Sequence, residues 1–138
     1  AVYGFPAGIT EDSRTIRNQY GLLYNAGVFS GSTSLVTEGW KIPNHLGDWD
    51  KLRNFLGGDS KVAEALSIAG FVGKPGGRRN ADEPFAFQEK DEVGYWWFSS
   101  VDGHNCWALS INPSNVSVPQ STNTYSRGYG FSIRFIRQ

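Results

Sequence analysis

The side chains able to do covalent or acid–base chemistry are sparse in this chain. The histidines His45 and His104 and the single cysteine Cys106 fall short of the four ligands that structural zinc needs. Cys106 lies two residues after His104, but a lone cysteine in a strand-like run is more often a small buried hydrophobe than a nucleophile. No Gly-x-Ser-x-Gly nucleophile elbow is present. We therefore expect no enzyme and no cofactor, with calcium left open because its oxygen ligands are hard to recognise in a sequence.

Two other stretches give weaker chemical signals. Residues 73–79, Gly-Lys-Pro-Gly-Gly-Arg-Arg, have the composition of a phosphate-binding loop but not the Walker spacing, and Pro75 removes a backbone donor. We interpret residues 73–81 as an irregular, tight loop that crosses a sheet. The carboxylates of residues 11–12 and 89–92 are adjacent in sequence, so we expect them to be solvated, and a glycosidase pair stays a minor alternative.

Polar and aromatic residues gather instead around three strand-like runs in the last third of the chain. These runs, 94–100, 104–111 and 128–137, are rich in aromatic and β-branched residues that suit a pleated, half-buried surface. The stretches between them contain Tyr, Asn, Ser and Arg, the residue types of adaptable recognition surfaces. We predict that the strands form a scaffold for a binding surface. The predicted ligand-binding residues are Tyr95, Trp97, Phe98, Asp102, His104, Asn105, Cys106, Ser110, Asn112, Asn115, Thr122, Asn123, Tyr125 and Arg127.

Length and charge limit the classes of partner. The 138 residues suit one domain that spans residues 1–138. A formal net charge of zero gives no field that would attract nucleic acid, and no apolar run is long enough to insert into a bilayer. One cysteine allows no disulfide within the chain. We therefore expect a protein or glycan partner, while the oligomeric state and any excision from a longer protein stay open.

The elements that hold this surface are expected to begin with an arm and a strand. Residues 1–13 form an extended arm that suits an edge strand, and residues 20–25 form a compact strand. A helix follows Pro43, with Asn44 as its N-cap and residues 57–58, Gly-Gly, as its end. Its apolar face repeats at three- and four-residue spacing. The face consists of Leu46, Trp49, Leu52, Phe55 and Leu56.

A second, shorter helix is expected at residues 60–69, before Gly70. Two early helices followed by a mostly antiparallel sheet define an α+β fold. Within that fold we expect Trp96 and Trp107 in the core. His45 is interpreted as a solvated residue at the start of the first helix.

Several short motifs follow one another along nearly the whole chain. They are Tyr20-Gly21-Leu22-Leu23-Tyr24-Asn25, Gly39-Trp40-Lys41-Ile42-Pro43, Trp49, Leu56-Gly57-Gly58-Asp59-Ser60, Gly76-Gly77-Arg78-Arg79-Asn80, Gly94-Tyr95-Trp96-Trp97, Ser99-Ser100 and Tyr129-Gly130-Phe131-Ser132-Ile133-Arg134. Each motif is weak alone, but their order and spacing resemble the Fibrobacter succinogenes major paralogous domain over roughly residues 20–137. The chain departs from the family pattern at Phe98, which is inserted, and at Phe135, where the family tends to have a cysteine.

The resemblance implies a fold similar to C-type lectins, with two helices flanking a small sheet and a ligand face built by the C-terminal strands and loops. The branch of that fold that generates formylglycine relies on a pair of cysteines, and this chain has one. The sugar-binding branch holds calcium with a Glu-Pro-Asn or Gln-Pro-Asp loop, whereas Glu83-Pro84 is followed here by Phe85. The resemblance thus favours a calcium-independent, non-catalytic ligand-recognition domain.

A further branch of the same fold supplies the variable proteins of diversity-generating retroelements. Those proteins keep a fixed scaffold and vary surface positions near the C-terminus, for instance in phage receptor binding. Residues 98–127 have a suitable mixture of polar residues for such diversification. The expected setting is a virion, or the extracellular or cell surface, with a protein or glycan receptor. The alternatives are a carbohydrate-binding adhesin module of a secreted bacterial protein and, third, an enzyme related to formylglycine generation.

Overall fold

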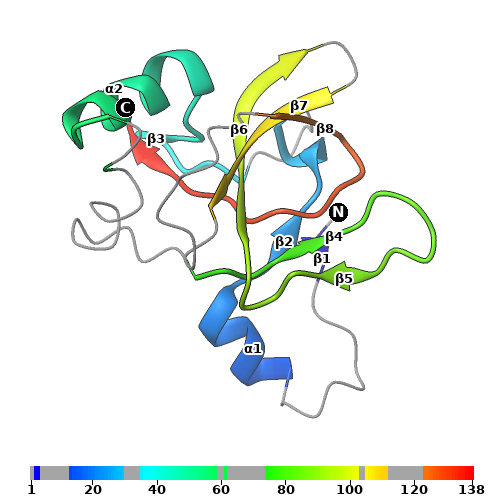
Figure 1. Cartoon of the computed structure of the whole chain (residues 1–138). Coiled ribbons are helices and arrows are strands. Elements are labelled where there is room, and N and C mark those ends of the chain that lie inside the picture. Colours follow the sequence, from blue (N-terminus) through cyan, green and yellow to red (C-terminus); the bar gives the residue numbers. More distant parts are fainter. Residues whose placement is uncertain are drawn as a thin grey trace.

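A computed structural model describes residues 2–3, 13–29, 35–58, 61, 74–102, 105–111 and 123–138. The strands lie between α1 at one side of the molecule and α2 at another (Figure 1). The elements in chain order are β1 (Val2–Tyr3), α1 (Ser13–Tyr20), β2 (Leu23–Tyr24), η1 (Ala26–Phe29), β3 (Trp40–Lys41), η2 (His45–Trp49), α2 (Asp50–Phe55), β4 (Arg78–Arg79), β5 (Phe87–Gln88), β6 (Gly94–Asp102), β7 (Asn105–Ile111), β8 (Asn123–Ser126) and β9 (Ile136–Arg137).

The strands of the described residues pair antiparallel in four small sheets. The largest has the order β6-β7-β8, and the others pair β1 with β2, β3 with β9, and β4 with β5. The β3–β9 pair joins positions far apart in the sequence, because Trp40 lies opposite Arg137 and Lys41 opposite Ile136. Short helices beside small antiparallel sheets confirm the predicted α+β class.

Strand β6 separates two apolar cores. Side chains of a strand alternate between its faces, and here Tyr95 and Trp97 enter one core while Trp96 and Phe98 enter the other. The first core is completed by Ala26, Cys106, Ala108 and Phe131, and the second by Trp49 and Leu109. The predicted half-buried surface is therefore wrong for residues 94–98 of β6, which are buried on both faces, whereas Ser99 is exposed. The prediction that Trp96 lies in the core is confirmed.

The first core is a stack of aromatic rings around Phe131. The ring of Phe131 lies 4.4 Å from that of Trp97 and 4.9 Å from that of Tyr95, between ring centroids. Trp97 is fully buried, and its indole N–H donates a 2.7 Å hydrogen bond to the carbonyl oxygen of Tyr24. A buried indole needs such a partner for its one polar group. This bond ties β6 to β2, two elements that no sheet ladder joins.

The helix predicted after Pro43 is present as η2, one turn of π-helix, continued by α2. The side chain of Asn44 caps it by accepting hydrogen bonds from the backbone N–H groups of Gly47 and Asp48. The carboxylate of Asp48 accepts in return from the Asn44 N–H at 3.0 Å, so each residue satisfies the other's backbone donor. Gly57 and Gly58 follow with positive φ, as expected for a helix end.

At the N-terminal side, the structure adds one helix that the sequence did not predict. Helix α1 ends at Tyr20, so the strand predicted at residues 20–25 shrinks to β2. Ile16 is its only buried apolar residue among those described, which leaves no periodic apolar face to recognise. The predicted pairing of the N-terminal arm is confirmed, because Val2 and Tyr3 pair with Tyr24 and Leu23.

Two further predictions are wrong in part, and two others lie outside the described residues. Residues 78–79 form strand β4, so the irregular loop predicted at residues 73–81 is wrong in its second half. The third strand of the main sheet is β8, from residues predicted to be a polar loop, whereas residues 128–137 contribute only bridges and the two-residue β9. The helix predicted at residues 60–69 and the side chain of Trp107 lie outside what the structure describes.

Candidate functional site

Five of the predicted ligand-binding residues lie inside the protein. They are Tyr95, Trp97, Phe98, Cys106 and Ser110. All five belong to β6 or β7, the strands that the two cores enclose. Because a buried side chain offers no surface to a partner, we correct the prediction that these five residues contact a ligand. They build the scaffold instead.

Cys106 is buried in the first core. Burial raises the pKa of its thiol, and the charge and hydrogen bond of the Arg127 guanidinium lower the pKa by less. The thiolate that a nucleophile needs is therefore disfavoured at neutral pH. Cys106 has the environment of a structural cysteine, as the sequence indicated.

Three of the predicted residues, Asp102, Asn105 and Arg127, are brought together with Ser126 at one end of the main sheet. Asp102 lies opposite Asn105 in the β6–β7 ladder, and Asn105 lies opposite Ser126 in the β7–β8 ladder. Arg127 follows Ser126 and is exposed. We call these four residues, Asp102, Asn105, Ser126 and Arg127, the sheet end. Asn123 pairs with Ala108 farther along the ladder, away from the sheet end.

Tyr125 is half-buried and belongs to the edge of the first core. Its ring meets the rings of Phe131 and Tyr129 edge-on, at 4.9 and 5.7 Å between centroids. Tyr125 therefore supports the scaffold and offers only part of its surface to a partner. The other predicted residues, His104, Asn112, Asn115 and Thr122, lie outside the residues that the structure describes.

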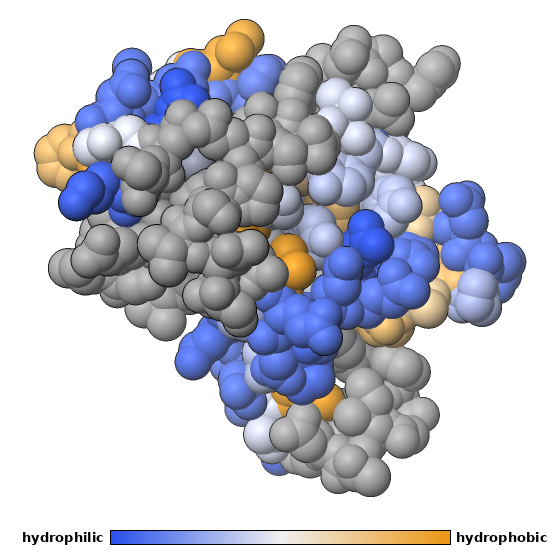
Figure 2. Space-filling view, in the orientation of Figure 1, coloured by the Kyte–Doolittle hydropathy of each residue, from blue (hydrophilic) through white to orange (hydrophobic). Residues whose placement is uncertain are grey.

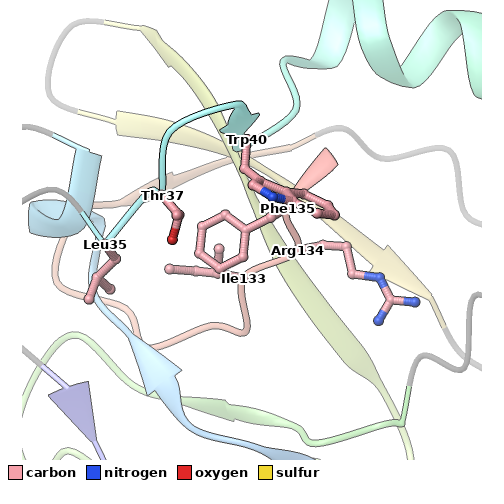
Figure 3. A pocket seen from close by; sticks show the side chains of 6 residues that line it. All are labelled: Leu35, Thr37, Trp40, Ile133, Arg134 and Phe135. Carbon is pink, nitrogen blue, oxygen red and sulfur yellow. The ribbon is translucent and has the colours of Figure 1, made fainter. Parts of the chain in front are cut away.

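An open depression lies beside the β3–β9 pair, where the sequence predicted no site. It has a cavity volume of about 500 Å³, and we call it the aromatic hollow (Figure 3). The described residues that line it are Leu35, Thr37, Trp40, Ile133, Arg134 and Phe135. Figure 3 shows the Phe135 ring between Thr37 and Ile133, with the Trp40 indole beside it and the Arg134 guanidinium on the side away from Leu35.

Large apolar side chains in the aromatic hollow are partly exposed to solvent. Leu35, Trp40 and Phe135 keep 44%, 41% and 38% of their surface accessible. Single exposed apolar residues are ordinary, but a group of them in a depression marks an interaction site. The backbone under them is fixed, because Trp40 and Arg137 pair directly and the Gln138 N–H donates to the Gly39 carbonyl at 3.0 Å. The rings are therefore held in place by an ordered framework.

Positive charge accompanies these rings. Arg134 lines the aromatic hollow, and the guanidinium carbon of Arg137 lies 5.9 Å from the centre of the Trp40 ring. A guanidinium over an indole face is attracted by the ring quadrupole and holds the ring's orientation. The hollow thus combines apolar contact area with positive charge.

A second depression adjoins the first. It has a cavity volume of about 340 Å³, and we call it the polar hollow. Tyr20, Tyr24, Lys74 and Ser132 line it, and it shares Ile133 and Arg134 with the aromatic hollow. The two depressions thus have Ile133 and Arg134 in common.

Elsewhere the charged groups hold the fold. The Arg78 guanidinium lies 3.0 Å from Glu89 and about equally near the rings of Tyr95 and Tyr129, at 5.6 and 5.7 Å from their centres. Figure 2 shows mainly hydrophilic residues over the regions of both α1 and α2, with apolar side chains at the rim near α2. In η2 and α2, Leu46 and Phe55 are 71% and 85% exposed. The described residues contain no group of three His, Cys, Asp or Glu that could hold a metal ion.

His45 begins η2, so its predicted place at the start of the helix is confirmed, but it is neither fully solvated nor the capping residue. Its ring lies 6.4 Å from the Phe98 ring between centroids and is half-buried, while Asn44 caps the helix. Phe98 also contacts Trp49, at 6.1 Å. His45 thus joins the edge of the second core.

Short helices, small antiparallel sheets and a strand enclosed by two aromatic cores define a small α+β domain. The model of the Fibrobacter succinogenes major domain family matches residues 6–137, and the chain belongs to this family. The resemblance found in the sequence motifs is thereby confirmed. No curated protein and no solved structure matches the chain. In the parts that the structure describes, every helix is too short or too polar to cross a membrane.

Proposed function

We propose that the protein is a non-catalytic ligand-recognition domain that binds a protein or glycan through its C-terminal strands and loops. The observation that supports this most is the aromatic hollow, in which partly exposed aromatic rings, a leucine and an arginine meet around a concave surface. Recognition sites combine apolar contact area with a few polar groups that fix orientation. Half of the described lining, residues 133–135, comes from the C-terminal segment.

Binding screens with the intact domain test this proposal. We would probe a glycan array and a library of displayed peptides, and then compare Phe135→Ala with Phe55→Ala. Both phenylalanines are exposed, but only Phe135 lies in the aromatic hollow. We expect Phe135→Ala to weaken a detected interaction about tenfold or more and Phe55→Ala to leave it nearly unchanged. Absence of any binder, or equal effects of the two substitutions, would contradict the proposal.

The finer part of the proposal is a C-type lectin-like fold and a role as the variable protein of a diversity-generating retroelement. The sheet end supports it, because strand register gathers Asp102, Asn105 and Ser126 beside the exposed Arg127. The expected setting is then a virion or a cell surface. A nearly identical template repeat beside the gene, differing at adenines, is the expected observation. Its absence would remove this role and leave the aromatic hollow as the basis of binding.

A carbohydrate-binding adhesin module is the alternative function. The exposed indole of Trp40 favours it, because a flat aromatic face can pack against the apolar face of a sugar ring. Reproducible binding of defined sugars on the array, lost in Trp40→Ala, would select this function. Binding only to displayed peptides would select protein recognition.

A further inference from the structure

We propose that the partner is an extended peptide segment of another protein, which adds as a strand beside residues 133–137 and places an apolar side chain in the aromatic hollow. This inference rests on the proposed function and deepens it by naming the class of ligand. It starts from the backbone of the C-terminal segment. Peptides that add to a sheet edge gain affinity from backbone hydrogen bonds, and pockets beside the edge select their side chains.

The backbone of the C-terminal segment turns its hydrogen-bonding groups to alternate sides. Phe131 exchanges hydrogen bonds of 3.0 and 2.8 Å with Tyr24 of β2. Ser132 faces the other way and forms two hydrogen bonds of 3.0 Å with β6. At the end of the segment, the Gln138 N–H donates to the Gly39 carbonyl beside β3. These partners fit an extended chain in which even-numbered residues face β6 and β3, and odd-numbered residues face the opposite side.

On that opposite side, backbone groups remain unused. Neither Ile133 nor Phe135 forms a backbone hydrogen bond with any of the described residues. Arg137 points the same way, because the bond from residue 138 to residue 39 makes its pairing with Trp40 a non-hydrogen-bonded one. Alternate residues of an extended chain are about 6.6 Å apart, which is the spacing at which a second strand presents its own groups. We call this side of residues 133–137 the C-terminal edge.

The C-terminal edge begins where β2 leaves the segment. Tyr24 pairs antiparallel with Phe131, so a longer β2 would continue beside residues 133 and 135. The chain departs from this course at Gly21, whose φ of +81° belongs to the turn between α1 and β2. Gly21, Leu22 and Ile133 line the polar hollow, which therefore marks the place that β2 vacates. A peptide strand would take the position that a longer β2 would have occupied.

The aromatic hollow lies beside the same residues and can anchor such a strand. Ile133 and Phe135 line it together with the partly exposed side chains of Leu35 and Trp40. Alternate side chains of an added strand point to one face, so an apolar residue can enter the hollow while its neighbours stay in water. A sugar chain could also contact the rings, but it does not present an N–H and a C=O together at every second unit. The unused backbone groups therefore favour a peptide.

Titration calorimetry of the intact domain tests the inference with three peptides. The first is a synthetic copy of the tightest binder recovered from a displayed library of peptides of about nine residues. The other two carry N-methyl groups at its even-numbered or at its odd-numbered residues. Each methylated form loses the N–H donors along one edge and keeps every side chain. We expect one methylated form to bind about tenfold or more weakly than the first peptide, and the other to change by less than about threefold.

Hydrogen exchange followed by NMR locates the added strand. The amide protons of Ile133 and Phe135 should exchange rapidly in the free domain and about tenfold or more slowly with the first peptide bound. The amides of α2 are the control and should not change. Rapid exchange at both positions in the bound state would overturn strand addition. Slow exchange in the free domain would also overturn it, because the C-terminal edge would then already be occupied.

Substitutions at Phe135 separate the backbone from the ring. Phe135→Ala removes the ring and keeps the N–H, whereas Phe135→Pro removes both. We expect the first to weaken binding about tenfold and the second about a hundredfold. The control is Phe55→Ala, an exposed residue of α2 that lines neither hollow. If Phe135→Pro does not fold, the methylated peptides and the amide exchange still decide the outcome.

The results separate this inference from the proposed function. Binding of a glycan through the aromatic hollow, with no peptide recovered, would overturn the inference and leave a recognition domain. Equal affinities of the two methylated peptides would overturn strand addition. Protection of residues 133 and 135 on concentrating the domain alone would overturn the separate partner in favour of a second copy of this chain. Failure to bind any peptide or glycan in the screens would overturn the proposed function itself.

Discussion

The hydroxyl of Tyr95 donates a 2.7 Å hydrogen bond to the carboxylate of Glu89, and the guanidinium of Arg78 lies 3.0 Å from the same carboxylate oxygen. The bond joins the segment after β5 to the face of β6 that enters the first core. Burial raises the pKa of Tyr95 above its ordinary value of 10.0, and the hydrogen bond to Glu89 raises it further. The neutral phenol is thus the form that the folded protein stabilises.

Tyr95→Phe tests the worth of this bond. We expect it to lower the free energy of unfolding by about 1–2 kcal/mol at neutral pH, because Glu89 loses a buried donor. A raised pKa in the folded state means that the stabilisation is full below the ordinary tyrosine pKa of 10.0 and is lost as the pH rises beyond it. Urea unfolding of both proteins from about pH 8 to about pH 11 should therefore show a difference that shrinks with pH, with the slope expected when folding is linked to a single proton.

Tyr95→Phe, Glu89→Gln and the double variant that combines them form a thermodynamic cycle with the wild type. Coupling of about 1 kcal/mol between the two positions is expected if the hydroxyl and the carboxylate interact directly. A difference between the wild type and Tyr95→Phe that stays constant with pH, or a coupling near zero, would count against this account.

Asp48 should control stability in acid. Burial raises the pKa of its carboxyl, but the hydrogen bond from the Asn44 N–H and the Lys41 ammonium at 2.9 Å outweigh burial and hold the pKa below 3.8. A lowered pKa contributes stability above that value, and the contribution is lost as the pH falls through the folded-state pKa. We expect Asp48→Asn to cost about 1–2 kcal/mol at neutral pH and to flatten the acid dependence of urea unfolding.

Asp50→Asn is the matched control for Asp48→Asn. Asp50 pairs with Arg53 at 3.2 Å on the exposed side of α2, with more than a third of its side chain accessible. An exposed ion pair of this kind contributes about 0.5 kcal/mol or less. Equal losses in the two variants would show that the cap formed by Asn44 and Asp48 is not what stabilises the helix start.

Gly77 should tolerate no side chain. Its φ is +70°, and a Cβ there would overlap the backbone carbonyl oxygen of Gln88 and lie 2.7 Å from the backbone nitrogen of Lys90. Gly21 also has a positive φ, of +81°, but open space around its Cβ position. We expect Gly21→Ala to cost about 1 kcal/mol through φ alone and Gly77→Ala to cost about 3 kcal/mol or more. Thermal melts that rank the two variants equally would contradict the overlap.

Cys106 should react slowly with alkylating reagents in the folded protein. It is buried, and the pKa of its thiol is raised, so both access and thiolate are limited. We expect iodoacetamide labelling, followed by mass spectrometry, to be far slower than in urea and to follow the unfolding rate. Rapid labelling without denaturant would indicate a reachable thiolate and would revive the formylglycine-generating alternative.

The helix after Pro43 was predictable because all its signals are local. The cap Asn44 and the terminal Gly57 lie within one stretch of chain, and the structure uses both. The predicted apolar face is used only in part. Trp49, Leu52 and Leu56 pack in the second core, whereas Leu46 and Phe55 are exposed, so the prediction that these two face inward is wrong. Helix α1 lacked these signals, because a single buried residue, Ile16, makes no periodic face. The sequence therefore predicted a helix reliably only where a single segment contained the N-cap, the apolar spacing and the terminating glycine.

The aromatic hollow could not be predicted in this way. It depends on the pairing of Trp40 with Arg137, two residues far apart in the chain, in strands of two residues each. Such short strands give no periodicity, and nothing local shows that they meet.

Residue type also failed to separate exposed rings from buried ones. Trp40 and Trp97 are the same amino acid, but the first is 41% accessible and the second 0%. The run of aromatics at residues 95–98 was correctly assigned to a strand, and only tertiary packing decides that both of its faces are covered. The sequence therefore shows which residue types suit a recognition surface, but not which of those residues reach the surface.

The two-residue β3–β9 ladder carries exposed rings of the aromatic hollow, which belong to neither core, although Ile133 in the same wall packs against the first core. We thus expect mutations at the exposed positions Leu35, Trp40 and Phe135 to cost little folding stability, whereas those at the buried positions 94–98 of β6 cannot be tolerated. Paralogues of this domain should diverge in what they recognise much faster than in how they fold, and new specificities should be easier to engineer here than in the main sheet.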